Sequence, residues 1–86
     1  MCTYLTESIE ATGSGKGAGG WFGLDEVNVY FDHPVHAPAD HTVNIDFRNV
    51  GQGPSARVAV ELSVDTARAL AKAIETTLAA APPGLV

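Results

Sequence analysis

The three histidines of this chain, the residues best suited to metal or proton chemistry, fall within one short segment. The stretch "YFDHPVHAPADH", residues 30–41, contains His33, His36 and His41, with Asp32 and Asp40 beside them. An imidazole changes charge near neutral pH and is the commonest metal ligand in proteins. A neighbouring carboxylate can take a proton or hold the ring in place. We therefore expect any chemistry of this protein to lie in this segment.

Three imidazoles form a suitable ligand set for a divalent transition metal, with zinc as the first choice and nickel, copper or iron as alternatives. Three protein ligands leave a fourth position open for water or substrate, which is the catalytic arrangement of zinc. The metal would activate water or polarise a carbonyl, so we expect hydration, hydrolysis, elimination or isomerisation of a small molecule. Asp32 or Asp40 would act as the base or orient an imidazole.

Two other interpretations stay open, because the histidine spacing matches no specific metal motif. One or two of the histidines could act as acid–base groups without a metal. Alternatively, the loop has no chemical role and the chain is a non-enzymatic, homo-oligomeric binding or assembly module. Its contact surface would then be the polar side of the sheet or the region of Trp21 and Phe22.

Alternating apolar and polar residues predict the strands that position these histidines. Residues 26–32, 42–48 and 57–63 each alternate strictly, which is typical of strands with one buried face; residues 3–10 form a weaker fourth candidate. His33 lies two residues after Phe31, and His41 lies two residues before Val43. Both histidines should therefore point to the apolar side at the joined end of one hairpin, with His36 folding back over them.

The C-terminal part changes to helical periodicity and completes the predicted fold. The apolar stripe consists of Ala67, Leu70, Ala71, Ile74, Thr77, Leu78 and Ala81. Ser63 is a suitable N-cap, and "APPG", residues 81–84, ends the helix. We interpret the glycine-rich residues 12–20 as a flexible connection and residues 49–56 as a turn. The prediction is a single α+β domain over residues 1–86, a four-stranded antiparallel sheet with one helix on its apolar face.

Composition and charge limit the remaining function classes. Charged residues make up 17% of the 86 residues, below the usual share of about 25%, which favours a homodimer or larger homo-oligomer. A net charge of −5 without a basic cluster argues against nucleic acid. We expect no membrane span, no signal peptide and a cytoplasmic protein. Cys2, the only cysteine, is a thiol without function or an extra soft ligand near the histidines.

The segments "MCTYLTE", "GSGKGAGGWF", "YFDHPVHAPADHTVNIDF" and "GPSARVAVEL" together resemble a family of short actinobacterial proteins, a domain of unknown function. The resemblance covers nearly the whole chain and implies a stand-alone protein of about this length. It implies no activity, so the functional hypotheses rest on the residues themselves.

Overall fold

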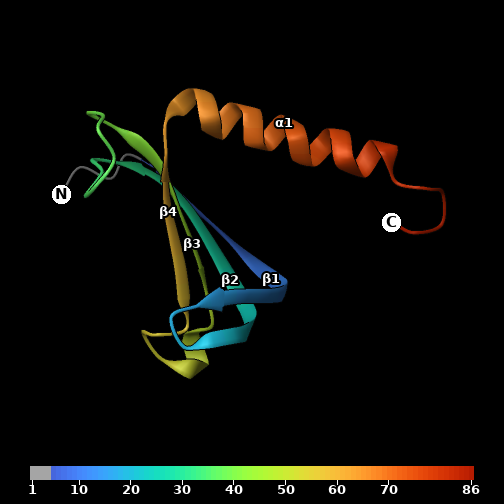
Figure 1. Ribbon diagram of the computed structural model, residues 1–86, viewed down its shortest axis with the longest axis horizontal. Helices are drawn as coiled ribbons and strands as arrows, with labels where there is room; N and C mark the ends of the chain where they lie inside the picture. Colours follow the sequence, from blue (N-terminus) through green and yellow to red (C-terminus); the bar gives the residue numbers. More distant parts are fainter. Residues whose placement is uncertain (1–4) are drawn as a thin grey trace.

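The computed structural model describes residues 5–86, which form one antiparallel sheet and one long helix (Figure 1). The strands are β1 (Thr6–Gly17), β2 (Gly20–Asp32), β3 (Thr42–Arg48) and β4 (Arg57–Leu62), and they are neighbours in chain order. A short 3₁₀ helix, η1 (Val50–Gln52), joins β3 to β4, and α1 (Val64–Ala80) follows β4. The predicted α+β fold class, with four antiparallel strands and a C-terminal helix packed against them, is confirmed.

The register of the central strands separates an apolar side of the sheet from a polar side. Phe31 lies opposite Val43, Val29 opposite Ile45, and Ile45 opposite Val60. Because side chains of directly opposed residues share one face of a sheet, the apolar residues of three strands gather on one side. The faces that the alternation predicts are the faces that form.

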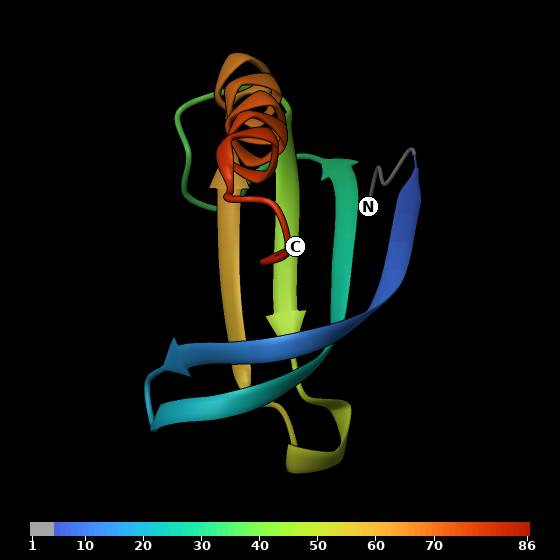
Figure 2. The ribbon, with the colours of Figure 1, turned by 90° about the vertical axis from the view of Figure 1, so that its right-hand side faces the viewer.

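The interpretation of residues 12–20 as a flexible connection is wrong, because most of this segment is strand. β1 runs to Gly17, a turn at residues 18–19 follows, and β2 starts at Gly20. After a register shift between Glu10 and Gly13 the hairpin curls across the apolar side towards β4 (Figure 2). A Cβ at Gly17 would lie 3.2 Å from Phe22 Cε1 and 3.3 Å from the Arg57 carbonyl oxygen. This glycine therefore permits a close approach between strands.

Helix α1 begins and ends as predicted but covers little of the sheet. Ser63 is the N-cap, its hydroxyl accepting from the Thr66 N–H at 3.2 Å, and the helix ends two residues before Pro82. It contacts β3 and β4 and then extends away from the sheet (Figures 1 and 2). The apolar stripe remains open, with Leu70, Ile74 and Leu78 exposed by 41%, 52% and 52%.

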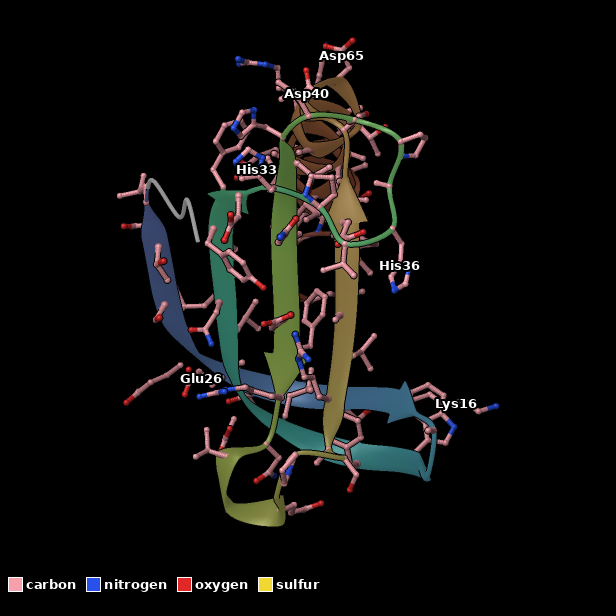
Figure 3. All side chains as sticks on the ribbon, turned by 90° about the vertical axis from the view of Figure 1, so that its left-hand side faces the viewer. Lys16, Glu26, His33, His36, Asp40 and Asp65 are labelled. Carbon is pink, nitrogen blue, oxygen red and sulfur yellow. The ribbon has the colours of Figure 1, made fainter. Side chains whose placement is uncertain are left out.

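Burial in this fold is greatest on the polar side of the sheet. Within residues 5–86, Ala56 is the one buried hydrophobic residue, whereas Asp32, Thr42 and Asn44 are buried polar residues. The loop of residues 33–41 passes over the polar side at the end of β3 and β4 (Figure 3). Across the described chain, no helix combines the length and the apolar character needed to cross a membrane.

Candidate functional site

His33 and His41 lie side by side, as strand parity predicts. Their ring centroids are 4.4 Å apart with the planes tilted by 32°, and His41 also stacks on Phe31 at 5.5 Å. The Nδ1 of His33 donates to the carbonyl oxygen of Asp40 at 2.9 Å. Since a carbonyl only accepts, Nδ1 carries the proton in the neutral ring, and Nε2 is left to accept a proton or to bind a metal.

His36 does not join this pair, contrary to the prediction that it folds back over the end of the hairpin. The Glu61 carboxylate on β4 accepts from the backbone N–H groups of Val35, His36 and Ala37, at 2.5, 3.0 and 3.0 Å. These three bonds hold the tip of the loop above β4. Figure 3 shows His36 there, away from His33.

The two aspartates proposed to act as the base or to orient an imidazole occupy different environments. Asp32 is buried at the end of β2, and its Oδ1 accepts from the backbone N–H of His33 at 2.7 Å. Asp40 is exposed, and it is its backbone carbonyl that holds His33. Asp32 therefore contacts the main chain of His33, while Asp40 orients the His33 ring through its own main chain.

Metal ligands are few around the pair. Among residues 5–86, no group of three or more His, Cys, Asp or Glu side chains lies close enough to hold a metal ion. Cys2, the extra soft ligand considered from the sequence, lies outside the described residues. One chain thus brings together two imidazoles of the predicted three.

A hollow of about 630 Å³ opens on the polar side of the sheet, beside the loop. Its polar lining comes from Tyr30, His36, Asn44, Asp46, Arg57 and Glu61, and its apolar lining from Val35, Ala37, Ala59 and Val60. A second hollow of about 700 Å³ continues towards Thr6 and Ser8 on β1 and shares Tyr30, Val35, Asn44 and Asp46 with the first. We call the first of these the polar hollow.

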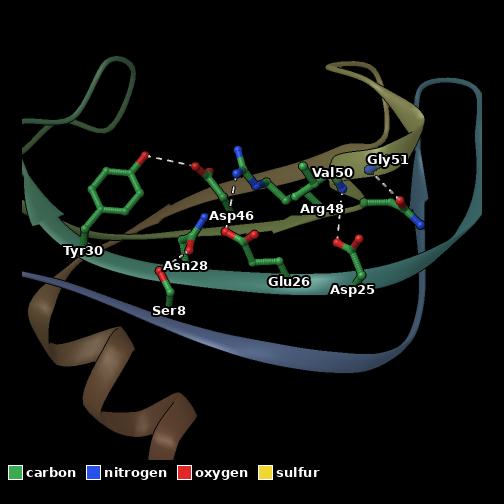
Figure 4. A network of polar contacts seen from close by, with 10 residues as sticks. Ser8, Asp25, Glu26, Asn28, Tyr30, Asp46, Arg48, Val50 and Gly51 are labelled. Carbon is green, nitrogen blue, oxygen red and sulfur yellow. Dashed lines mark hydrogen bonds and ion pairs between the residues drawn. The ribbon is translucent and has the colours of Figure 1, made fainter.

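Two sets of hydrogen bonds hold polar residues of the hollow. The Thr42 hydroxyl donates to Oδ1 of Asn44, a lining residue, at 2.5 Å. Tyr30 donates to Asp46 Oδ2 at 3.3 Å (Figure 4). Arg57 donates to the other oxygen of Asp46 at 2.9 Å. Each group is thereby held in one orientation before any ligand arrives.

Three titratable groups that line this hollow have displaced pKa values. Burial, together with the Asp46 carboxylate, raises the pKa of Tyr30 above its ordinary value. The hydrogen bond to Asp46 raises the pKa of Arg57. The backbone N–H groups of Val35, His36 and Ala37 lower the pKa of Glu61. Shifted pKa values gathered in one concavity are a physical indication of a functional site.

Sequence reasoning treated the polar side of the sheet only as a possible contact surface and so missed the polar hollow. The alternation does place Tyr30, Asp46 and Arg57, from three strands, on the same polar side of the sheet, and this was the signal in the sequence that could have identified them. Arg48 in turn pairs with Glu26 on β2, at 3.4 Å (Figure 4). The contact of Glu61 with the histidine loop had no signal in the local pattern, because the partners are 24 to 26 residues apart.

Residues 1–86 match the model of a family described as "Family of unknown function (DUF6295)". The chain belongs to this family. The match confirms that the resemblance covers the chain, while the actinobacterial origin stays a prediction. No curated protein and no solved structure matches the chain.

Proposed function

We propose that the protein is a small ligand-binding domain whose site is the polar hollow. The observation that supports this most directly is the meeting of Tyr30, Arg57 and Glu61, three groups with displaced pKa values, in one concavity. A concave surface with a few oriented polar groups and some apolar wall is the usual form of a small-molecule site.

The lining defines the chemistry of the ligand. Arg57 lines the hollow and uses one amino group on Asp46, so further N–H donors of its guanidinium remain for a ligand. Asp46 offsets the positive charge of Arg57, and Val35 and Ala59 supply an apolar wall. The ligand we propose is a small organic molecule with hydrogen-bond acceptors, such as a hydroxyl or carboxylate group, next to an apolar edge.

NMR titration of the ¹⁵N-labelled protein with a panel of small carboxylates and polyols tests this proposal. We expect a hit to shift the amides of residues 44–46 and 57–61, and Arg57→Gln to weaken its binding at least several-fold. Arg68→Gln, which changes an exposed arginine of α1 in the same way, is the matched control. Shifts confined to other surfaces, or equal effects of the two variants, would contradict the proposed site.

The histidine pair favours a second candidate function, the binding of a divalent transition metal. We propose that His33 and His41 supply two imidazole ligands, with the Asp40 carbonyl fixing the His33 tautomer as second-shell groups commonly do. Water, a substrate or another protein group would complete the coordination. Should a reaction accompany binding, the buried Asp32 is the carboxylate beside the pair.

Zinc or nickel titration of untagged protein tests the second candidate. We expect the metal to raise the melting temperature and to shift the ring signals of His33 and His41, and His41→Ala to abolish both effects. His36→Ala should leave both effects intact if two histidines bind; an equal loss would instead support a three-histidine site. Unchanged melting and ring signals in the presence of metal would refute metal binding.

A further inference from the structure

The apolar side of the sheet is a broad surface that the rest of the described chain leaves half open. It is lined by Val27, Val29, Phe31, Val43, Ile45, Phe47, Val58, Val60 and Leu62, all only half-buried. Helix α1 borders it at one end of the strands, and the curled end of the β1–β2 hairpin borders it at the other (Figures 1 and 2). We call the space between them the apolar recess.

Helix α1 carries a stripe that fits such a recess. Leu70, Ile74 and Leu78 project from its exposed part, where no other element of the described chain covers them. A helix of 17 residues is marginal in water without tertiary packing of its apolar face. Its charged residues are Asp65, Arg68, Lys72 and Glu75, which sum to zero in a chain of net charge −5. The neutral helix can therefore approach the acidic remainder of a second copy without net repulsion.

The size of the exposed surface indicates how much contact is missing. The accessible surface is 6278 Å², whereas a compact monomer of this mass exposes about 4,800 Å². The excess of roughly 1,500 Å² per chain equals what one partner commonly buries in an obligate dimer. The radius of gyration, 14.4 Å, likewise exceeds the value of about 12 Å expected for a compact domain of this length.

We propose that two copies of this chain form a two-fold dimer in which α1 of each lies in the apolar recess of the other. Its length of about 26 Å matches the roughly 23 Å of a seven-residue strand. The helix is held away from its own sheet because Ser63 alone separates β4 from α1. The hydroxyl of Ser63 bonds both the N–H and the Oγ1 of Thr66, which fixes the exit direction. This dimer is independent of the ligand in the polar hollow.

Light scattering of the full chain tests whether the partner is a second copy of the same chain. We expect twice the chain mass of 8.9 kDa at micromolar concentration. Ile74→Asp should produce monomer or unfolded chain, and Thr76→Asp, on the opposite side of α1, should leave the dimer intact. A wild-type monomer that melts cooperatively at all concentrations, or an equal loss of dimer in both variants, would overturn the proposal.

Disulfide trapping tests the arrangement and does not require Ile74→Asp to fold. A Cys2→Ser chain that carries Ile45→Cys and Ile74→Cys should form covalent dimers on mild oxidation, because Ile74 of one copy approaches Ile45 of the other. The chain with Ile45→Cys and Thr76→Cys is the control and should remain largely uncrosslinked. An intramolecular disulfide would show that α1 folds onto its own sheet, and an absence of crosslinks would show that α1 enters neither recess. Either result would refute the proposal that α1 lies in the recess of the other copy.

Discussion

Replacing Thr42 by valine should destabilise the protein although the two side chains have almost the same shape. Thr42 is completely buried, and its hydroxyl donates to Oδ1 of the buried Asn44 at 2.5 Å. The substitution removes this hydrogen bond and leaves Asn44 Oδ1 without its donor, and an unpaired acceptor in a buried site costs about 1–3 kcal/mol. We expect a total loss of about 1–3 kcal/mol in the free energy of unfolding.

Urea unfolding monitored by circular dichroism measures this loss. With a slope of about 1–1.5 kcal/mol per molar urea, typical of a small domain, the midpoint should fall by roughly 0.7–3 M. Wild type and variants must be compared at one protein concentration, because the stability of a dimer depends on it. Thr76→Val, on the exposed side of α1, is the matched control and should change stability by less than about 0.5 kcal/mol.

A double variant separates the hydrogen bond from general packing. Thr42→Val with Asn44→Leu removes both partners, so it should cost less than the sum of the two single changes. If Thr42→Val proves as stable as Thr76→Val, or if the two single losses simply add, the buried bond does not stabilise the end of the sheet as described.

Three further predictions concern other parts of the molecule. The folded-state pKa of Glu61 is lowered, so its contribution to the free energy of unfolding is complete above the ordinary pKa of about 4.3 and is lost as the pH falls through the lower pKa of the folded state. Amide exchange of residues 35–37 should therefore accelerate in that pH range, and Glu61→Gln should weaken this pH dependence. Gly17→Ala should lower the melting temperature, because the new Cβ would lie 3.2 Å from a phenylalanine ring, whereas Gly19→Ala meets nothing within 4 Å and should be nearly neutral; equal effects would contradict the close approach. NMR titration of the tyrosine rings should show Tyr30 ionising above the ordinary pKa of a tyrosine, and an ordinary value would argue against its burial beside Asp46.

The strands, the helix and the histidine pair could be predicted because each depends on a local pattern. Alternation assigns each side chain to one face of a strand, so counting from Phe31 and Val43 was enough to place His33 and His41 together. The helix boundaries likewise follow from Ser63 and the prolines after α1. These features depend on residues only a few positions apart.

The position of His36, the role of the glycines and the polar hollow could not be predicted in this way. His36 is drawn away by the bonds between Glu61 and the loop, whose partners are 24 to 26 residues apart. Gly17 permits the close approach of the β1–β2 hairpin to Arg57 on β4, whereas the glycine-rich composition of residues 12–20 suggested a flexible connection. Pairing of Tyr30, Asp46 and Arg57 required the register of three strands.

The sequence by itself determined which residues form strands and helix and which side of each is apolar, because the period of the pattern follows from backbone geometry. Only the tertiary structure decided what covers each side. Thr42 and Asn44 are buried on the polar side, over which the histidine loop passes, while α1 leaves the sheet and its stripe remains open. The physical reason is that a periodic pattern specifies which face must be covered, whereas contacts between distant residues select the element that covers it. The hydrogen bonds of Glu61 to the histidine loop act in this way on the polar side, and the single-residue connection at Ser63 sets the direction of α1.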